Sequence, residues 1–418
     1  MATPKVVVLG GGFGGLETAY RLRKRVGEKA DISIVSDRER FLFKPNTIYI
    51  PYGLDPDKLT VDLAKPAARK GIHLKIAHAE EIDTVRQTVN AAGESIPYDY
   101  LVVATGATMR PEEIPGLSEF AQTIWTPAEM LKLRAAYAKL LADVQGGARR
   151  QVLFLVPPNN KCSGPLYEMV FMLDSWLRKK RVRDKVEIGY TTYEAHFIQA
   201  FGPRLHEVVT KQFAERGITG RNSMVVEKVT DGAVQYVGGE ELPFNLLITF
   251  PAYAASTPFA GLPADARGFI KTDLPTRRVE GLDNVYAVGD AADFPVKQAF
   301  LAFLQGDAAS EQIAASILDE KPGLVFDPVS MCVMEGFDRA TFAQVPLQLT
   351  GRPELPVEVR PDAADMYRVG TGKTWRLGKK ALGIYLPWRF SHGEPFHDGL
   401  PWKVMEVALK GMSATLAK

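Results

Sequence analysis

Short runs rich in apolar residues recur along the chain, and small or polar residues bound each of them. Three such runs, at residues 6–9, 31–36 and 98–103, are typical of strands in a buried parallel sheet. Helical patterns separate them. A second set begins with the apolar run 151–156 and continues at 185–190. Two sets of alternating strands and helices predict an α/β fold with two Rossmann-like domains.

A glycine cluster directly follows the first predicted strand. The spacing G-x-G-x-x-G falls on Gly10, Gly12 and Gly15, where a strand turns into a helix and a dinucleotide pyrophosphate can approach the backbone. The next strand ends at Ser36 and Asp37, a position from which a side chain can bind ribose hydroxyls. We favour Asp37 for this contact, with Ser36 as the neighbouring choice. The alternative for Asp37 is a surface turn, because a run of charged residues starts there.

Two later motifs extend the first site. The strand over 98–103 ends in the small-residue turn Thr105-Gly106, which lets the chain pass close to a cofactor. Another apolar strand ends at Gly289-Asp290. With the glycine cluster, these motifs resemble the flavoproteins that have two dinucleotide-binding domains. The resemblance implies that FAD is the cofactor, that Asp290 binds its ribitol chain, and that the segment with Lys44 and Pro45 lies against the flavin.

The second unit lacks the features that bind a pyridine nucleotide. Its strand is followed by Pro157 and Pro158, which fix φ and remove two amide donors where a diphosphate would need them. Its next strand, 185–190, runs into Thr191-Thr192-Tyr193 and has no carboxylate at its tip. We therefore expect a degenerate NAD-type domain that binds NADH poorly.

In place of glycines, this turn carries Cys162 at the start of a predicted helix, with Lys161 before it and Pro165 in the first helical turn. The helix N-terminus and a neighbouring cation both favour the thiolate, so we expect a lowered pKa for Cys162. The alternative is an inert buried cysteine. The pattern favours a thiol site.

The composition of the chain argues against a nucleic-acid partner, a disulfide-stabilised fold and a membrane-spanning helix. The chain has 51 basic and 49 acidic residues, a net charge of +2, which does not indicate a nucleic-acid partner. Two cysteines in 418 residues are too few for a fold stabilised by several disulfides, so a pair would be redox-active. No signal peptide is visible, and no apolar run is long enough to span a membrane. We predict no metal site.

The stretch Cys162-Ser163-Gly164-Pro165-Leu166-Tyr167-Glu168 resembles the region around the first redox cysteine in two families. These are the sulfide:quinone oxidoreductases and the flavoprotein subunits of flavocytochrome c sulfide dehydrogenases. Both carry a second redox cysteine several tens of residues after the Gly-Asp motif, and Cys332 lies 42 residues after Asp290. The resemblance implies that the pair oxidises sulfide to sulfane sulfur or polysulfide and passes electrons to FAD. This chain lacks the third cysteine of most quinone-linked members.

The same resemblance suggests roles for three more residues. Lys297 would lie near the flavin and stabilise its reduced form, Glu168 would accept a proton from sulfide or the thiols, and His196 would lie near the quinone or sulfide channel. Each has a simpler alternative: a solvated lysine, a charge at a helix start, and a structural histidine.

The last part of the chain has a different character, with aromatic residues among lysines and arginines. Trp402, Met405, Leu409 and Met412 form one apolar helical stripe. Packing on the core or on a second subunit is the simpler interpretation of such a stripe, but the resemblance favours contact with a membrane. It also suggests that residues 390–397 form the mouth of a quinone pocket.

These observations predict three domains: an FAD-binding domain over 1–108 and 246–322, a second Rossmann-like domain with Cys162 over 109–245, and a C-terminal α+β domain with Cys332 over 323–418. We interpret the chain as a peripheral membrane sulfide:quinone oxidoreductase. The alternatives are a flavin subunit that donates to a haem partner, a type II NADH:quinone oxidoreductase, and a flavin-binding sensor without turnover. Assembly into a homo-oligomer stays open.

Overall fold

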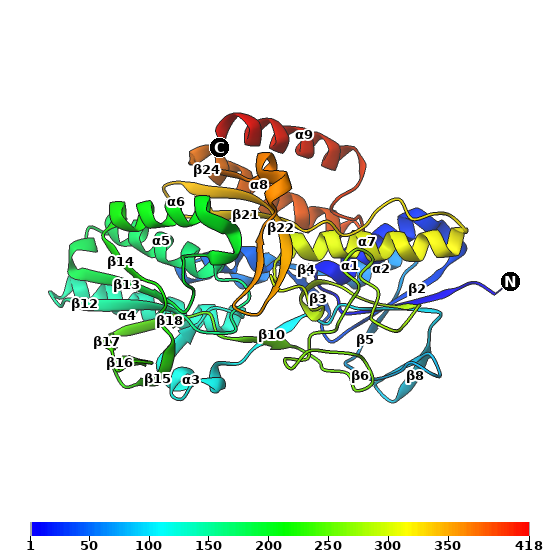
Figure 1. Ribbon diagram of the computed structural model, residues 1–418, viewed down its shortest axis with the longest axis horizontal. Helices are drawn as coiled ribbons and strands as arrows, with labels where there is room; N and C mark the ends of the chain where they lie inside the picture. Colours follow the sequence, from blue (N-terminus) through cyan, green and yellow to red (C-terminus); the bar gives the residue numbers. More distant parts are fainter. Residues whose placement is uncertain (1, 418) are drawn as a thin grey trace.

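The computed structural model describes residues 2–417, so Met1 and Lys418, the outermost residues of two predicted domains, lie outside the described part. The first sheet is parallel, with the order β20-β9-β1-β2-β5. Its strands are β1 (Lys5–Leu9), β2 (Asp31–Ser36), β5 (His73–Ile76), β9 (Tyr100–Val103) and β20 (Val285–Ala287). Two helices, α1 (Phe13–Val26) and α7 (Ala299–Leu318), pack side by side next to this sheet (Figure 1). The central strands are almost entirely apolar because protein covers both of their faces.

The second sheet is also parallel and has the order β11-β18-β12-β13-β14. Its strands are β11 (Ala121–Thr123), β12 (Arg150–Val156), β13 (Val186–Thr192), β14 (Ile218–Arg221) and β18 (Leu246–Thr249). Three helices accompany it: α4 (Pro127–Gln145), α5 (Gly164–Lys179) and α6 (Gly202–Arg216). The predicted boundary at residue 246 falls at the start of β18, and this strand still pairs with β12. The chain therefore returns to the first sheet only at β20.

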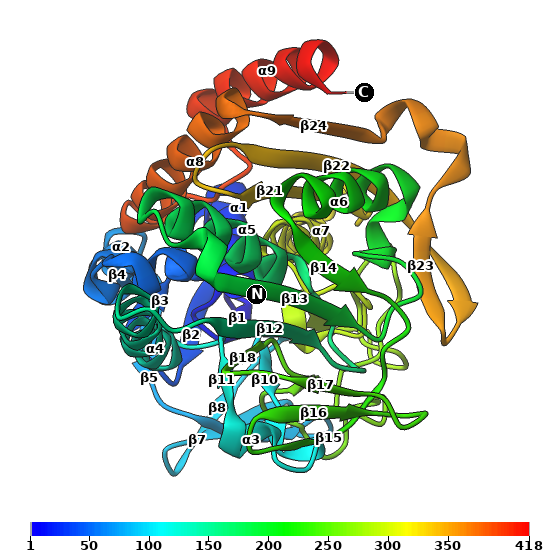
Figure 2. The same ribbon diagram turned by 90° about the vertical axis from the view of Figure 1, so that its left-hand side faces the viewer.

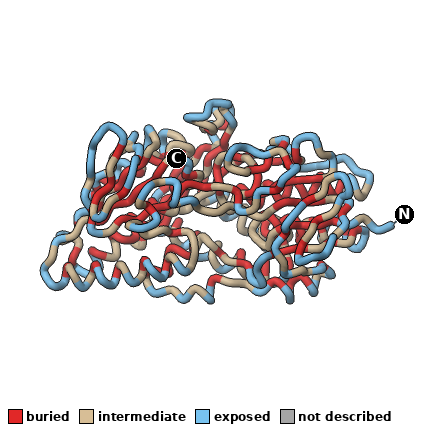
Figure 3. Tube along the Cα trace, turned by 90° about the horizontal axis from the view of Figure 1, so that it is seen from below, coloured by how far each residue is buried: buried red, intermediate tan, exposed pale blue. Residues whose placement is uncertain are grey.

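The C-terminal part consists of an antiparallel sheet and two helices. The strands are β21 (Val329–Glu335), β22 (Ala340–Arg352), β23 (Leu355–Val359) and β24 (Arg368–Gly372), and the helices are α8 (Lys373–Ser391) and α9 (Gly399–Leu416). Figures 1 and 2 place α8 and α9 together at one outer edge of the molecule. The buried residues gather in two regions, one around each parallel sheet (Figure 3). Among the described residues, no helix is long and apolar enough to cross a bilayer.

Short elements complete the fold. The remaining strands are β3 (Arg40–Leu42), β4 (Thr60–Asp62), β6 (Ala79–Asp83), β7 (Thr88–Ala91), β8 (Glu94–Pro97), β10 (Ala107–Met109), β15 (Val226–Thr230), β16 (Ala233–Tyr236), β17 (Glu241–Pro243) and β19 (Tyr253–Ala255). The short helices are α2 (Ala64–Arg69), α3 (Leu117–Phe120), η1 (Gly27–Lys29), η2 (Lys44–Tyr52), η3 (Pro56–Leu59), η4 (Pro111–Glu113), η5 (Arg183–Lys185), η6 (Gln199–Phe201), η7 (Gly289–Ala291) and η8 (Pro361–Met366). The predicted α/β architecture with two Rossmann-like units and a C-terminal α+β region is confirmed.

Candidate functional site

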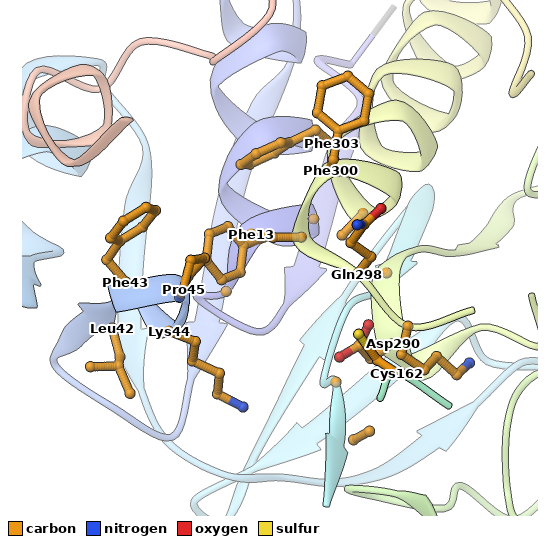
Figure 4. Close-up of a pocket in the computed structure, with 18 of the residues that line it drawn as sticks. Phe13, Leu42, Phe43, Lys44, Pro45, Cys162, Asp290, Gln298, Phe300 and Phe303 are labelled. Carbon is orange, nitrogen blue, oxygen red and sulfur yellow. The ribbon is translucent and has the colours of Figure 1, made fainter. Parts of the chain in front are cut away.

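One cavity of about 410 Å³ connects the glycine turn of the first domain with the two cysteines and the C-terminal helices. Figure 4 shows part of its wall, with Cys162 and Asp290 close together. All three parts of the fold contribute to its wall. Its lining residues include Gly10, Gly12, Ser36, Asp37, Lys44, Pro45, Thr105, Gly106, Gly289, Asp290, Lys297, Cys162, Glu168, Cys332, Lys379, Leu382, Leu386, Phe396, Trp402 and Leu409. The sequence motifs predicted to form one site therefore do meet.

The glycine turn has the geometry that a bound pyrophosphate requires. Gly10 has φ +111°, and a Cβ there would lie 2.3 Å from the carbonyl oxygen of Ala104. A Cβ on Gly15 would lie 2.0 Å from the carbonyl oxygen of Gly10, which fixes the close packing of α1 on the strand. A Cβ on Gly12 would meet nothing within 4 Å and would occupy space that a ligand needs. Because no side chain caps α1, its first amides are free to bind phosphate oxygens.

The residues expected to bind the ribose lie at the tip of β2. Asp37 is exposed and lines the cavity, whereas Ser36 is buried. The Ser36 hydroxyl donates to the carbonyl oxygen of Arg38 (2.8 Å) and accepts from its N–H (3.2 Å). Asp37 therefore has the freer side chain, which supports the choice between the two.

Three charged residues surround the middle of the cavity. Burial raises the pKa of Asp290, while Lys297 and Lys44 oppose this rise. Burial lowers the pKa of Lys297 to about 7 and that of Lys44 to about 8. The Lys297 ammonium donates to the carbonyl oxygen of Ala292 and lies 3.8 Å from the centre of the Phe269 ring. Lys297 is therefore a buried cation, not a solvated surface lysine.

The sulfur atoms of the two cysteines both lie near Gly164. From the position of a Cβ on Gly164, the Sγ of Cys332 lies at 3.9 Å and the Sγ of Cys162 at 4.0 Å, so the sulfur atoms are at most 7.9 Å apart. Both are free thiols in the structure. Cys332 belongs to β21, where it pairs with Ala343 of β22. Cys162 lies in the loop between β12 and α5, close to Asp290 (Figure 4).

The loop that carries Cys162 is held by a residue that sequence reasoning missed. The Asn160 side chain is buried; its amide donates to the carbonyl oxygen of Phe250 (2.7 Å), and its Oδ1 accepts the N–H of Cys162 (2.9 Å). The signal available in the sequence was weak, since an Asn-Asn pair in a turn is common.

The prediction of an acidic thiol at Cys162 is wrong. Burial and the nearby Cys332 thiol raise the pKa of Cys162, and the N–H of Gly164 only partly opposes this effect. Lys161 does not reverse it. Burial also raises the pKa of the Cys332 thiol to about 12. Desolvation therefore outweighs the helix terminus in its effect on the pKa of Cys162, and it is also the largest influence on the pKa of Cys332.

Glu168 lies in the cavity wall beside Cys332 and has a partner from the C-terminal domain. Lys379 of α8 forms an ion pair with Glu168 and donates to the carbonyl oxygen of Val333 (2.8 Å). The Glu168 carboxylate also accepts the N–H of Glu335 (2.7 Å). Burial raises the pKa of Glu168, and Lys379 is the leading opposing influence. Glu168 is thus within the site, as predicted, but as half of a buried ion pair.

His196 does not reach the cavity. It is exposed, and its ring lies 5.0 Å from the ring of His206 on α6. The chain leaves the second sheet after β13, and Glu194 holds the following turn by accepting from Thr192 and from the N–H of Gln199. This turn directs His196 to the surface, so its predicted catalytic place is not supported.

The apolar stripe predicted on α9 faces the protein. Trp402 and Leu409 line the cavity, and Met412 packs against the cluster around Phe342 and Trp375. The large apolar side chains of α9 that are exposed are Leu400, Val404, Val407 and Leu416, and the first three have exposed fractions of 74%, 63% and 71%. The residues predicted to contact a membrane are therefore the inner face of this helix, and a second stripe is its outer face. Phe396, from the predicted pocket mouth, does line the cavity.

Residues 4–144 and 181–307 match the pyridine nucleotide-disulphide oxidoreductase family. The chain belongs to this family. It is an oxidoreductase, and FAD is its cofactor. The glycine turn, the uncapped helix α1 and the residues around Asp290 fit that cofactor. The match leaves out residues 145–180, which carry β12, Cys162 and α5. Cys162 and Cys332 both lie outside the residues that match the family.

Individual relatives point in two directions. The chain is 25% identical over 334 residues to a mitochondrial sulfide:quinone oxidoreductase of Dictyostelium discoideum, a match that covers 77% of this chain and 72% of the relative. It is 26% identical over 319 residues to an external alternative NAD(P)H-ubiquinone oxidoreductase of Arabidopsis thaliana, covering 69% of this chain and 54% of the relative. The fold is similar to the crystal structure of the sulfide:quinone oxidoreductase from Aquifex aeolicus, with a TM-score of 0.84, 24% identity, and coverage of 97% and 96% of the two chains.

Proposed function

We propose that this protein oxidises sulfide to sulfane sulfur or polysulfide through Cys162 and Cys332 and delivers the electrons through FAD to a membrane quinone. One observation carries the proposal: the only two cysteines of the sequence come from different domains and lie within about 4 Å of one point in the wall of the predicted flavin cavity. The sulfide:quinone oxidoreductases among the relatives and solved structures support the same reaction.

The chemistry of the pair follows from thiol–disulfide exchange. When Cys162 and Cys332 form a disulfide, attack by hydrosulfide breaks their S–S bond, leaving a persulfide on one cysteine and a thiolate on the other. The raised pKa of both thiols makes thiolate the less stable form, so the thiolate is a strong nucleophile when it arises. FAD, when bound, accepts the two electrons that the sulfur atoms release. Lys44, Asp290 and Lys297 are the charged residues that we propose to hold it.

A pyridine nucleotide is the less suitable electron donor. Pro157 and Pro158 follow β12 at the position of the diphosphate turn, and Asn159 beyond them has φ 62°. Glu194, the first carboxylate after β13, is turned inward to Thr192 and Gln199, and burial raises its pKa to about 7. It is therefore engaged in the protein and not available to a ribose.

The C-terminal helices suggest how a quinone reaches the cavity. On α8 the exposed residues Leu377, Ala381, Ile384 and Trp388 recur at helical spacing, and on α9 the exposed stripe is Leu400, Val404 and Val407. Exposed lysines accompany both stripes, at Lys373, Lys380, Lys403 and Lys410. Such a face suits the surface of an anionic bilayer. The inner faces of the same helices provide Leu382, Leu386, Trp402 and Leu409 to the cavity, so we propose that quinone enters between them.

Anaerobic stopped-flow reduction tests the reaction. We expect sulfide to bleach the flavin absorption band rapidly and NADH to bleach it slowly. Cys162→Ser and Cys332→Ser should abolish bleaching by sulfide, whereas Met331→Leu, which changes a neighbour of Cys332 at nearly constant volume, should retain it. Reduction of decylubiquinone without any cytochrome would distinguish a quinone acceptor from a haem partner. Faster bleaching by NADH than by sulfide would refute the proposal.

A liposome experiment tests the membrane surface. Vesicles of phosphatidylcholine and phosphatidylglycerol should co-sediment the wild-type protein. The double substitution Leu400→Glu and Val404→Glu should release it, because it places two charges in the proposed contact. Val85→Glu is a matched control, since Val85 is 92% exposed in the turn between β6 and β7, far from α9 in the sequence. Equal loss of binding in the control would remove the case for α9.

A further inference from the structure

A buried acidic cluster lies outside the cavity and has no part in the chemistry described above. It contains Glu17 of α1, Asp307 of α7 and His397 of the segment between α8 and α9. One carboxylate oxygen of each acid and one imidazole nitrogen all lie within 4.8 Å of one another. Glu17 is fully buried, and the side chains of Asp307 and His397 are more than nine-tenths buried. These residues come from the FAD-binding domain and from the C-terminal segment.

The cluster fixes the C-terminal segment to the first domain. The Glu17 carboxylate accepts the backbone N–H of Phe396 (2.6 Å) and of His397 (3.1 Å). The Nδ1 of His397 is hydrogen-bonded to Asp307 Oδ2 at 2.7 Å. Two consecutive amides and one imidazole of the same segment are therefore held by two acids from two different helices.

Few charges face this cluster from the neighbouring elements. Arg21 of α1 lies 3.7 Å from Asp307 Oδ1, and Tyr385 of α8 is close enough for Glu17 to raise its pKa. Other nearby cations have partners: Arg389 donates to the carbonyl oxygens of Pro395 and Asp398, and Lys24 pairs with Asp398. Asp307 Oδ1 and His397 Nε2 are buried and accept or donate no hydrogen bond among the described residues. The negative charges of Glu17 and Asp307 are therefore only partly compensated by nearby cations and hydrogen-bond donors.

This arrangement favours a retained proton. Burial first, and then the carboxylate of Asp307, hold the pKa of Glu17 well above its usual range. The two backbone N–H groups favour the ionised form of Glu17, but they do not outweigh burial and the like charge. Two buried carboxylates this close repel each other when both are ionised, and one proton retained by the cluster would relieve that repulsion.

The cluster lies directly behind the aromatic end of the cavity. Phe303 precedes Asp307 by one helical turn, and its ring stacks on that of Phe396 at 4.7 Å. The ring of His397 lies 4.6 Å from that of Trp402. Phe303, Phe396 and Trp402 all line the cavity, and Figure 4 shows Phe303 beside Phe300 and Phe13 at this end. Displacement of the segment at 396–397 would therefore change the shape of the site.

We propose that Glu17, Asp307 and His397 are positioning residues for the quinone end of the cavity, and that one proton held in this cluster keeps its aromatic wall in place. The inference rests on the proposed function for the identity of the acceptor. Loss of the proton leaves two adjacent buried anions, and the segment with Phe396 and His397 moves away to hydrate them. Quinone affinity then falls as pH rises, without a change in the reaction of sulfide with the cysteines.

The first test is the pH dependence of quinone reduction by the FAD-loaded protein. The KM for decylubiquinone should rise with pH by up to about tenfold per pH unit, the limit for one linked proton, with a smaller change in kcat. Glu17→Gln should have a low KM that does not vary with pH, because the amide cannot lose a proton, its oxygen still accepts one of the two N–H groups, and its NH2 can donate to Asp307. Glu28→Gln, an exposed neutralisation beyond the end of α1, should keep the wild-type profile.

The second test is independent of turnover. Hydrogen exchange, corrected for intrinsic rates, should show that peptides covering 396–409 lose protection as pH rises in the wild type and keep it in Glu17→Gln. Asp307→Asn offers the same readout if Glu17→Gln does not fold. A pH-independent KM in the wild type, or the same exchange profile in wild type and both variants, would overturn the inference. Failure to reduce any quinone would refute the proposed function, and the exchange experiment would still decide the role of the cluster.

Discussion

Substitution of Lys379 by methionine should destabilise the protein in a way that depends on pH. Lys379 and Glu168 retain only 10% and 8% of their side-chain exposure, and their ion pair links α8 to α5. Methionine preserves much of the chain length and packing but leaves the Glu168 carboxylate with the N–H of Glu335 as its remaining donor. Removal of one partner from such a buried pair typically costs about 3–5 kcal/mol, or at least two powers of ten in the unfolding equilibrium.

The sign of the pH dependence follows from Glu168. Its pKa is already raised, and Lys379 is the leading influence that lowers it, so the substitution raises it further. A carboxyl group whose pKa is higher in the folded than in the unfolded protein costs little stability at pH 4.5 and progressively more as pH rises. The loss in Lys379→Met should therefore be small near pH 5 and large near pH 8, as measured by urea unfolding.

A double-mutant cycle gives the decisive comparison. Lys379→Met combined with Glu168→Gln should recover most of the lost stability, because the glutamine carbonyl still accepts from Glu335 and no buried charge remains, giving a coupling energy of at least ~2 kcal/mol. The same cycle affects sulfur reactivity, since Glu168 raises and Lys379 lowers the pKa of Cys332. Alkylation of Cys332 at pH 8 should slow in the single variant and recover in the double one. A loss below 1 kcal/mol, or no recovery, would show that the pair is solvated.

Four other substitutions test the site. Gly12→Ala should fold normally but bind FAD at least about tenfold more weakly, because its Cβ enters open space that the cofactor needs. Gly15→Ala should unfold at a lower temperature, since its Cβ would lie 2.0 Å from a carbonyl oxygen. Equal FAD affinities in Gly12→Ala and wild type would contradict the assignment. His196→Ala should leave sulfide oxidation unchanged in steady-state assays, and a large drop would restore its predicted role. Lys297 has a pKa of about 7, below its usual value, so its burial makes the apoprotein more stable as pH rises from 7 to 9. Thermal unfolding of Lys297→Met should show that this contribution is gone.

The features that sequence could predict are those that neighbouring residues determine. Gly10, Gly12 and Gly15 form one turn, and their spacing alone defines how the backbone approaches a ligand. The placement of Cys162 and Cys332 in the wall of one cavity was expected only from resemblance, since nothing local in either segment indicates the other. Lys379 was missed because it lies 211 residues from Glu168 and belongs to a helix with no distinctive motif.

Burial and helix orientation were the main sources of error. A cysteine near a helix start suggests an acidic thiol, but the strand and domain that bury Cys162 come from distant parts of the chain. On α9, the stripes that begin at Leu400 and at Trp402 both have helical spacing, so the pattern cannot decide which one faces inward. The rest of the fold decides it.

The two sulfur atoms differ in how firmly the backbone holds them. Cys332 is anchored in the ladder between β21 and β22. Cys162 belongs to a connecting loop, which is held at single points by the Asn160 side chain and by backbone hydrogen bonds from Tyr253 to Asn159 and from Lys297 to Lys161. Each sulfur atom added to a bridge between them lengthens it by an S–S bond of about 2.05 Å. In such a growing chain the end bonded to Cys332 would stay in place, and the end bonded to Cys162 could move with its loop. If the proposed reaction extends such a bridge, the conformational freedom of residues 157–163 would limit its number of sulfur atoms, so stiffening that loop should shorten the product.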